Sequence, residues 1–495
     1  MKKYILAIDA GTTSSRAIIF DKNGQEIAIA QHEFEQHFPK EGWVEHDPLE
    51  IWSSQKQAIE DVLSKNDIQA SEIDSIGITN QRETTVIWNK KTGIPIYNAI
   101  VWQDRRTADI CSDLDQKGHA QTIQNKTGLV LDAYFSGTKI QWILNQNIET
   151  RKKAEAGELL FGTIDTWLIW KLSNGRYHVT DPSNASRTML YNIHALDWDN
   201  ELLELINVPK QILPNVISSS EKIGVVQLES WDDEIMISGI AGDQQAALFG
   251  QLCFDPGEVK NTYGTGCFCV MNTGNSPVQS KNKMLTTIAW QINGETTYAL
   301  EGSVFIGGAL IQWLRDGLNL ISSAEEIEDL AKSVESNGGV TFISALTGLG
   351  APYWDPNAFG AIMGITRGTQ KGHLARAALE AIAMRSREII IEMQKDAGIQ
   401  YQGLKVDGGA CKNNLLMQIQ ADLLNTNVIR PKTTETTALG VAFLAGLASG
   451  FWKSRKEIES LWEKDREFVP NQNIQSKKTI SLWQERISKI ITNES

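Results

Sequence analysis

The sequence predicts an α/β protein made of two structurally related halves. Short apolar segments alternate with polar, helix-forming segments along most of the chain, which is typical of this fold class. The opening arrangement at residues 4–20, a buried strand followed by a Gly/Thr turn and a second strand, returns at residues 258–271. A chain of 495 residues is also too long for one hydrophobic core. We therefore expect a boundary near residue 250, with one domain at 1–250 and the other at 251–495.

The first half begins with short strands separated by turn residues. Residues 21–24, Asp-Lys-Asn-Gly, supply turn chemistry between the second and third strands. Asp47, Pro48 and Glu50 then stand at the N-cap, first and third positions of a predicted helix. The apolar runs that we expect to form strands lie at residues 4–8, 16–20, 27–30, 75–79, 84–88 and 99–102.

The second half repeats the opening theme with predicted strands at 258–262 and 267–271. Farther along, apolar residues recur with helical spacing over residues 379–393, which predicts an amphipathic helix. The longest uncharged stretch, residues 436–452, is rich in Gly, Ala and Ser and has few large apolar side chains. A buried helix is therefore favoured over a membrane span, which needs about 20 predominantly apolar residues.

Composition excludes several classes of protein. The 47 basic and 60 acidic residues give a net charge of −13, which disfavours nonspecific binding to nucleic acid or anionic lipid. Five cysteines, an odd number without a pairing framework, fit a reducing compartment. Cys267 and Cys269 could be half of a metal site, but their spacing is better explained by one face of a core strand. The first apolar run stops at Asp9, shorter than the core of a signal peptide. We expect a cytoplasmic protein without membrane insertion.

Residues 9–16, Asp-Ala-Gly-Thr-Thr-Ser-Ser-Arg, have the composition of a phosphate-binding turn. Glycine allows a close approach of backbone N–H groups, and the hydroxyls and Arg16 add further donors. Asp9 at the end of the preceding strand is placed to hold Mg²⁺. A plain hairpin with a solvated arginine is the simpler alternative, but a tight turn does not need these hydroxyls or the arginine. Residues 263–266, Tyr-Gly-Thr-Gly, form a weaker second turn of the same kind.

Two other segments place polar residues at strand ends. Asp243 follows the apolar run 235–240 and precedes an apolar helix, so it is either the N-cap of that helix or a carboxylate that faces a cleft. The two readings are compatible. Residues 406–414, Val-Asp-Gly-Gly-Ala-Cys-Lys-Asn-Asn, allow the backbone to approach a flat ligand such as a nucleoside, although an ordinary β–α turn has a similar composition.

Several common nucleotide and metal motifs do not occur in the sequence. It has no Gly-x-x-x-x-Gly-Lys-Ser/Thr motif and lacks the protein-kinase motif set. It also has no His-Glu-x-x-His and no paired Cys-x-x-Cys. Phosphate binding would therefore depend on the two Gly/Thr turns.

Together these motifs resemble the FGGY family of carbohydrate kinases, in the superfamily of sugar kinases, actin and Hsp70, and within that family the members that phosphorylate glycerol. The resemblance runs along nearly the whole chain. Its blocks are Asp9–Arg16, Gly42–Pro48, Ile78–Thr85, Tyr134–Ile143, Phe161–Trp167, Ser238–Gly250, Asn261–Cys267, Thr347–Asp355, Gly360–Ile365 and His373–Glu380.

The resemblance implies two actin-like (ribonuclease H-like) domains, with mixed sheets flanked by helices and the active-site cleft between them. It implies that glycerol contacts Arg82, Glu83, Trp102, Tyr134, Asp243, Gln244 and Phe268. It implies that ATP contacts Thr12, Thr13, Ser14, Arg16, Thr265, Gly308, Gln312, Gly409 and Asn413. Asp243 would be the general base, Arg16 would offset charge on the transferred group, and Asp9 and Asp243 would hold Mg²⁺. Family members form homodimers or homotetramers.

The chain departs from the family in one informative loop. Some members use the segment equivalent to residues 224–234 for control by a sugar bisphosphate or by phosphorylation, through Arg or His. Here the loop has neither residue, and its successive acids at 232–234 would repel a bisphosphate. Two alternatives to a glycerol kinase activity stay open: a pentulose or hexulose kinase of the same family, and a non-enzymatic ATP-binding protein like actin.

Overall fold

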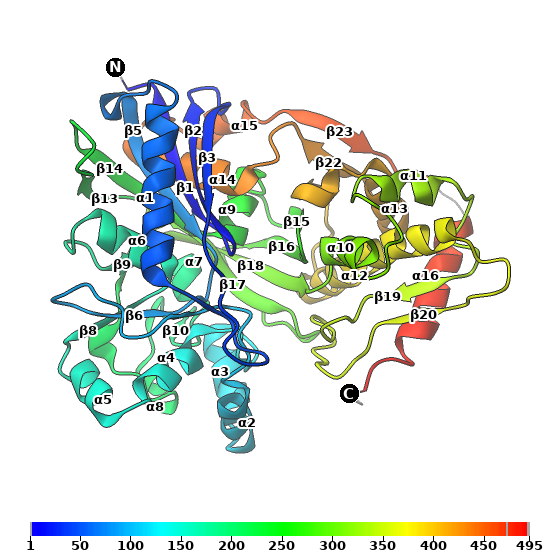
Figure 1. The fold of residues 1–495 in the computed structure, drawn as a ribbon, viewed down its shortest axis with the longest axis horizontal. Helices are drawn as coiled ribbons and strands as arrows, with labels where there is room; N and C mark the ends of the chain where they lie inside the picture. The colour runs from blue at the N-terminus through cyan, green and yellow to red at the C-terminus, as the bar shows by residue number, and fades with distance from the viewer. Residues whose placement is uncertain (1, 472–473, 493–495) are drawn as a thin grey trace.

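The computed structural model describes residues 2–471 and 474–492, and only the backbone of residues 474 and 475. Two mixed β-sheets, one in each half of the chain, form the frame of the molecule (Figure 1). The predicted α/β architecture with two related halves is confirmed. In Figure 1 the first sheet lies on the left behind helix α1 (Pro48–Ser64), and the second half extends to the right.

The first sheet has the strand order β13-β14-β5-β1-β2-β3. Strand β1 pairs antiparallel with β2 and parallel with β5, and β5 pairs parallel with β14. Side chains of β1 alternate between the two faces, with Leu6 and Ile8 on one and Ile5 and Ala7 on the other. The strands are β1 (Tyr4–Ala10), β2 (Ser14–Asp21), β3 (Glu26–Glu33), β5 (Ile73–Asn80), β13 (Ser220–Val226) and β14 (Ile235–Gly242).

The second sheet repeats this topology. Its order is β17-β18-β16-β15-β21-β22-β23, and β15 pairs antiparallel with β16 and parallel with β21, as β1 does with β2 and β5. Strand β17 is an additional edge strand that pairs only with β18 among the described residues. The strands are β15 (Val259–Tyr263), β16 (Cys267–Gly274), β17 (Leu285–Ile292), β18 (Glu295–Val304), β21 (Leu404–Asp407), β22 (Val428–Pro431) and β23 (Lys464–Phe468).

Helices cover both faces of each sheet. Helix α1 begins where predicted, because the Asp47 side chain accepts a hydrogen bond from the Leu49 backbone N–H at 2.8 Å. Together α1 and α6 (Ile164–Leu172) cover one face of the first sheet. The predicted amphipathic helix is α12 (Lys371–Ala397), which packs on the second sheet against Cys267 and Cys269. The two thiols are therefore buried core groups of strand β16, as expected from their spacing.

Two helices lie between the sheets and join them. Helix α9 (Asp243–Gly250) follows β14, and α14 (Thr436–Ser449) returns from the second half to pack on β1, β5 and β14. One apolar cluster contains residues of both helices and of both sheets, including Ile5, Phe249, Trp290 and Phe443. The uncharged stretch predicted to be a buried helix is thus α14, which lies at the centre of the molecule (Figure 1).

The remaining elements complete the periphery. In the first half they are β4 (Glu45–His46), β6 (Val86–Asn89), β7 (Ala99–Ile100), β8 (Leu159–Gly162), β9 (Val179–Thr180), β10 (Tyr191–Asn192), β11 (Asp197–Trp198), β12 (Asn215–Val216), α2 (Ala108–Gln116), α3 (Ala120–Thr127), α4 (Ser136–Leu144), α5 (Ile148–Glu155), α7 (Pro182–Ala185) and α8 (Asn200–Leu205). In the second half they are β19 (Thr341–Ile343), β20 (Ala361–Met363), α10 (Gly308–Asp316), α11 (Glu326–Lys332), α13 (Asn414–Leu424), α15 (Arg455–Glu459) and α16 (Ile474–Ile487).

Two strand predictions were wrong at their ends. The strand expected at 84–88 begins only at Val86, because Glu83 has a φ of 60° and turns the chain. The strand expected at 99–102 ends at Ile100, and Trp102 lies beyond it and packs on Tyr134. Within residues 2–471 and 474–492, no helix combines the length and the apolar character needed to cross a membrane.

Close helix packing at the centre depends on glycine. A Cβ added at Gly440 would lie 1.8 Å from the Ala246 carbonyl oxygen. One added at Gly250 would lie 2.0 Å from the Thr436 carbonyl oxygen.

We expect Gly440→Ala to lower the free energy of unfolding by at least about 2 kcal/mol, because the two helices must separate. Thermal unfolding measures the loss. Gly368→Ala is the matched control, because its added Cβ would have only a contact of 3.9 Å. Equal melting temperatures for both variants would contradict this packing.

Burial of His46 predicts an acid-sensitive fold. The ring nitrogens of His46 lie 2.7 Å from Gln36 Oε1 and 3.4 Å from Gln81 Nε2. Burial, with a smaller effect of His37, lowers the pKa of His46 from 6.5 to about 3. The unfolded chain therefore binds a proton below pH 6.5 that the folded chain does not, so stability falls as the pH falls from 6.5 towards 3.

Between pH 7.5 and 5 this group should cost about 2 kcal/mol of stability. His46→Gln should lose correspondingly less stability over the same interval in urea denaturation. The exposed His194, replaced by Gln, should follow the wild type. Parallel pH curves for wild type and His46→Gln would contradict the assignment.

Candidate active site

The first Gly/Thr turn, residues 11–13, joins β1 to β2. It is closed by a hydrogen bond of 3.0 Å from the Gly11 N–H to the Ser14 carbonyl oxygen. Thr13 is exposed and Thr12 is half-buried, whereas Ser14 is buried and its hydroxyl accepts from Gln31 Nε2 at 3.1 Å. The turn thus presents two threonines outward, and the serine hydroxyl is also held from the neighbouring strand.

Arg16 and Asp9 are cross-strand neighbours next to this turn. The guanidinium pairs with the Asp9 carboxylate through Nη2 and with Glu435 through Nη1 at 2.7 Å. Burial raises the pKa of Asp9, which Arg16 opposes and the nearby Glu435 and Asp243 reinforce. Arg16 therefore offsets the repulsion that Asp9 experiences from Glu435 and Asp243.

The second turn, residues 264–266, lies against the start of α10. The Thr265 carbonyl oxygen accepts from the Gly307 and Ala309 N–H groups at 2.8 and 3.0 Å. The end of β21 is equally close, because a Cβ at Gly408 would lie 2.6 Å from the Tyr263 carbonyl oxygen. The structure therefore places Thr265 near Gly308 and the Gly408-Gly409 turn, and at Gly308 and Gly408 an added Cβ would clash with the backbone of the second turn and its strand.

Gln312 and Asn413 lie farther out on the same elements. Gln312 is exposed one turn into α10. The Asn413 carboxamide oxygen accepts from the Leu416 N–H at 2.8 Å and caps α13. Helices α10 and α13 carry these two residues, and within the described residues neither forms a side-chain hydrogen bond with the second turn. The Asn413 oxygen is already used by the cap.

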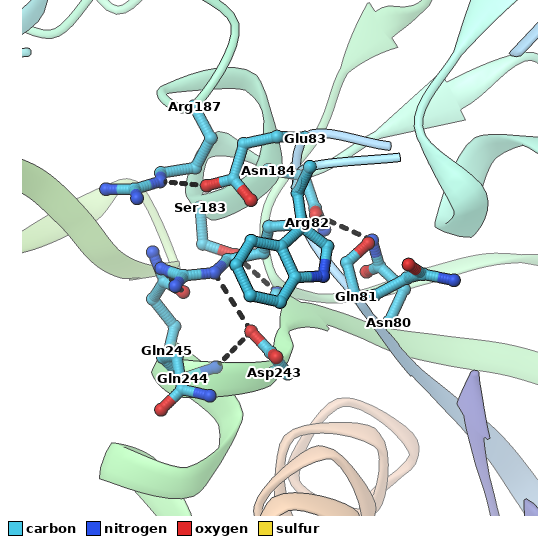
Figure 2. Close-up of polar contacts among 12 residues, drawn as sticks. Asn80, Gln81, Arg82, Glu83, Ser183, Asn184, Arg187, Asp243, Gln244 and Gln245 are labelled. Carbon is cyan, nitrogen blue, oxygen red and sulfur yellow. Dashed lines mark hydrogen bonds and ion pairs between the residues drawn. The ribbon is translucent and has the colours of Figure 1, made fainter. Parts of the chain in front are cut away.

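Asp243 is the first residue of α9, at the end of β14. The N-cap position belongs to Gly242, so the capping interpretation of Asp243 was wrong. Instead, Asp243 Oδ1 accepts from the Gln244 N–H at 2.7 Å and lies 2.9 Å from Arg82 Nε (Figure 2). Its side chain keeps 31% of its exposure, whereas that of Arg82 keeps 2%. The carboxylate is therefore oriented by the protein and open to a ligand.

A network of buried charges lies behind Asp243. Arg82 forms two hydrogen bonds to Glu301 of β18, from Nη1 to Oε2 at 2.5 Å and from Nη2 to Oε1 at 3.0 Å. Arg187 donates from Nε to Glu83 Oε1 at 2.6 Å and from Nη2 to Glu301 Oε1 at 3.0 Å (Figure 2 shows the contact with Glu83). Glu83 has a positive φ of 60°, a strained conformation for a residue other than glycine.

Three aromatic side chains pack together next to these buried charges, where the Arg187 guanidinium lies 5.5 Å from the Tyr134 ring. Trp102 packs edge-to-face on Tyr134 and on Phe268, with ring centroids 5.7 and 6.2 Å apart. The Trp102 indole N–H also donates to the Thr12 hydroxyl at 3.1 Å. Because Phe268 follows the second turn, Trp102 connects both Gly/Thr turns with the buried charges. Segments far apart in sequence thus contact one another through Trp102.

Gln244 is fixed by a residue that sequence reasoning missed. Lys260 Nζ of β15 donates to Gln244 Oε1 at 2.5 Å and to the Thr262 hydroxyl at 2.8 Å. Burial lowers the pKa of Lys260, against the opposing effects of Asp407 and Asp243. Since the ammonium holds the amide oxygen, the Gln244 NH₂ group is the end left to meet a ligand.

Arg187 and Glu301 were missed as well. The only local signal was a charged residue inside a predicted or apolar strand segment, as with Lys260 in the strand expected at 258–262 and Glu301 after Tyr-Ala-Leu. Arg187 gave no signal beyond its place in a polar loop. Lys260 thus holds Gln244, Arg187 holds Glu83, and Glu301 holds Arg82.

The carboxylates also have the chemistry to hold a divalent cation. Asp9 is 2% exposed, and the negative charges of Asp243 and Glu435 raise its pKa in addition to burial. A hard cation held by carboxylate oxygens would relieve this repulsion. Asp9 and Asp243 offer carboxylate oxygens of the kind that Mg²⁺ prefers.

Comparison with known proteins gives the same family in both halves. The N-terminal domain model of the FGGY family of carbohydrate kinases matches residues 4–250, and its C-terminal domain model matches residues 259–449. A glycerol kinase 2 of Thermotoga maritima is 57% identical over 488 residues, covering 98% of both chains. The crystal structure of Plasmodium falciparum glycerol kinase with ADP is 37% identical and superposes with a TM-score of 0.92 over 99% of both chains. A ligand-bound xylulose kinase of Lactobacillus acidophilus is 25% identical, with a TM-score of 0.89 over 98% of this chain and 97% of its own. The chain belongs to the FGGY family of carbohydrate kinases.

Proposed function

We propose that this enzyme transfers the γ-phosphoryl group of ATP to glycerol and releases sn-glycerol 3-phosphate. The observation that carries the proposal is Asp243, the first residue of α9, whose carboxylate is partly exposed. Arg82 orients this carboxylate, and the aromatic side chains of Trp102 and Tyr134 pack together nearby. Support also comes from the Thermotoga maritima glycerol kinase 2, which matches this chain from end to end at 57% identity. The glycerol kinase that carries ADP has the same fold at a TM-score of 0.92.

A triol needs donors and acceptors for its hydroxyls and an apolar surface for its C–H edge. Arg82 and the Gln244 NH₂ group offer donors, and Glu83 and Asp243 offer acceptors. The hydroxyl of Tyr134 serves as either. Trp102 and Phe268 provide the apolar wall. These side chains, Arg82, Glu83, Trp102, Tyr134, Asp243, Gln244 and Phe268, form the proposed glycerol site.

The nucleotide would lie between the two Gly/Thr turns. Thr12, Thr13, Ser14, Arg16 and Thr265 would contact the phosphates, and Gly308, Gln312, Gly409 and Asn413 would line the adenosine end. Arg16 is already paired with Glu435, so we expect it to exchange that partner for a phosphate oxygen.

In the reaction Asp243 accepts the proton of a primary hydroxyl as that oxygen attacks the γ-phosphorus in line. Arg82 holds the carboxylate for this role through its Nε. Arg16 offsets negative charge on the transferred group. Asp9 and Asp243 are the proposed ligands of Mg²⁺. When bound, the ion would neutralise phosphate charge.

Three further proposals concern the domains, the compartment and the oligomer. We propose two domains, 1–250 for glycerol and the first phosphate turn and 251–495 mainly for ATP. The enzyme would act in the cytoplasm, as a homodimer or homotetramer.

A pentulose kinase is the nearest competing function, because the xylulose kinase shares the fold. A panel of glycerol, xylulose and ribulose with coupled detection of ADP separates the two. Glycerol should have the highest kcat/KM. Faster turnover of a pentulose would overturn the proposed substrate. An ATPase activity that no polyol stimulates would instead indicate a protein like actin.

Asp243→Asn tests the proposed base. The amide keeps the size of the side chain but cannot accept the proton, so kcat should fall by at least about 10³-fold. ATP affinity, measured by isothermal titration, should change little. Asp61→Asn on the outer helix α1 is the control and should keep wild-type turnover. A kcat for Asp243→Asn near that of the wild type would end the assignment.

A further inference from the structure

Glu301 of strand β18 is a fully buried carboxylate that does not line the proposed glycerol site but touches two arginines behind it. It accepts two hydrogen bonds from Arg82 and one from Arg187. Both arginines belong to the first half of the chain, whereas β18 belongs to the second sheet. Burial alone would raise the pKa of Glu301, but Arg187 and Arg82 lower it to about 2. The group is therefore charged at every physiological pH.

The two bonds to Glu301 decide which edge of Arg82 faces Asp243. Both Nη atoms donate to Glu301, and Nη1 is also 3.2 Å from Gln245 Oε1. That leaves Nε as the group that reaches Asp243 Oδ1, at 2.9 Å. A planar guanidinium held along one edge cannot rotate without losing both bonds. The orientation of Asp243 thus depends on Glu301 through Arg82.

Arg187 transmits the same constraint to Glu83. Its Nη2 donates to Glu301 and its Nε to Glu83 Oε1, while its guanidinium lies over the rings of Tyr134 and Phe135, at 5.5 and 5.2 Å. Glu83 is buried and its Oε1 accepts from Arg187 Nε, so this bond fixes the position of its carboxylate. Among the described residues, Arg187 Nη1 is buried without a hydrogen-bond partner. Arg187 is therefore held by its bonds to the two glutamates.

We propose that Glu301 is a positioning residue of the polyol site. Its hydrogen bonds from Arg82 and Arg187 fix both guanidinium groups, and these in turn orient Asp243 and Glu83. This inference deepens the proposed function and rests on it. The competing explanation is that Glu301 only neutralises two buried arginines and so stabilises the fold.

The two explanations differ in their kinetic consequences. Asp243 is the proposed base, and Glu83 is a proposed contact of glycerol. Glu301→Gln should therefore lower kcat and raise the KM for glycerol. A displacement of about 1 Å at a reacting group costs about 100-fold in rate, so we expect kcat/KM for glycerol to fall by about 100-fold. The KM for ATP should stay within about twofold of the wild-type value, because no residue of the nucleotide set touches Glu301 in the described part of the chain.

Arg187→Lys is the second variant. It keeps the charge but cannot bond both glutamates with one planar group. Since Arg187 reaches Glu83 and not Asp243, this variant should raise the KM for glycerol by about tenfold with a smaller change in kcat. Glu301→Gln should thus change both kcat and KM, whereas Arg187→Lys should change mainly KM. Lost stability alone would not produce this difference between the two variants.

Glu388→Gln is the matched control. Glu388 of α12 pairs with the buried Arg385 and accepts hydrogen bonds from Tyr353 and Trp483, but on the far face of the second sheet. It should lower the melting temperature and leave both kinetic parameters for glycerol unchanged. If Glu301→Gln behaves like this control, the positioning role is wrong. If Glu301→Gln does not fold, an unchanged KM in Arg187→Lys overturns the proposal.

The substrate assignment can fail separately. If the wild-type enzyme prefers a pentulose, the same three variants are measured with that sugar, and the KM split then tests positioning independently of glycerol. Isothermal titration of the preferred polyol gives a readout of binding that does not require turnover.

Discussion

Buried charge is the constraint that the rest of this site depends on. Arg82, Arg187 and Lys260 are fully buried, and Glu83 and Glu301 are buried beside them. Loss of one partner from such a set typically costs about 3–5 kcal/mol, because the remaining charge stays in a medium that solvates it poorly. Arg82 and Arg187 each pair with a buried glutamate, whereas Lys260 is held by the Gln244 oxygen and the Thr262 hydroxyl. Here the partners come from both sheets, so the two halves must be in register for either to be stable.

Close helix packing provides that register. The contacts of Gly440 with Ala246, and of Gly250 with Thr436, bring α14 and α9 together backbone to backbone. Helix α9 carries Asp243 at its first position, and α14 begins next to Glu435, the partner of Arg16. A helix that enters from the second half therefore fixes both the carboxylate and the arginine pair. The shared apolar cluster explains why no linker-like segment separates the halves.

Local patterns predicted the fold and the outer shell of the site. The strand–turn–strand repeat, the Asp47 cap and the buried stretch at 436–452 each depend on neighbours in sequence, and each was found in the structure. Glu301 could not be paired in this way, because it lies 219 residues from Arg82 and 114 from Arg187. A charged residue in a strand indicates that some partner exists, but only the folded chain identifies it. The positive φ of Glu83 was hidden for the same reason, since tertiary contacts impose it.

The two related halves have also diverged at the same point of their turns. Next to the first turn, the cross-strand pair is Asp9 and Arg16, two charges that suit phosphate and metal. The corresponding pair next to the second turn is Thr262 and Phe268, where the threonine hydroxyl accepts from Lys260 and the phenyl ring packs on Trp102. One copy of the motif thus supplies electrostatics, and the other supplies an apolar wall and a hydroxyl. The two sheets form a similar frame, but a reaction between an anion and a neutral polyol needs two different surfaces, and the different residues at this one pair provide them.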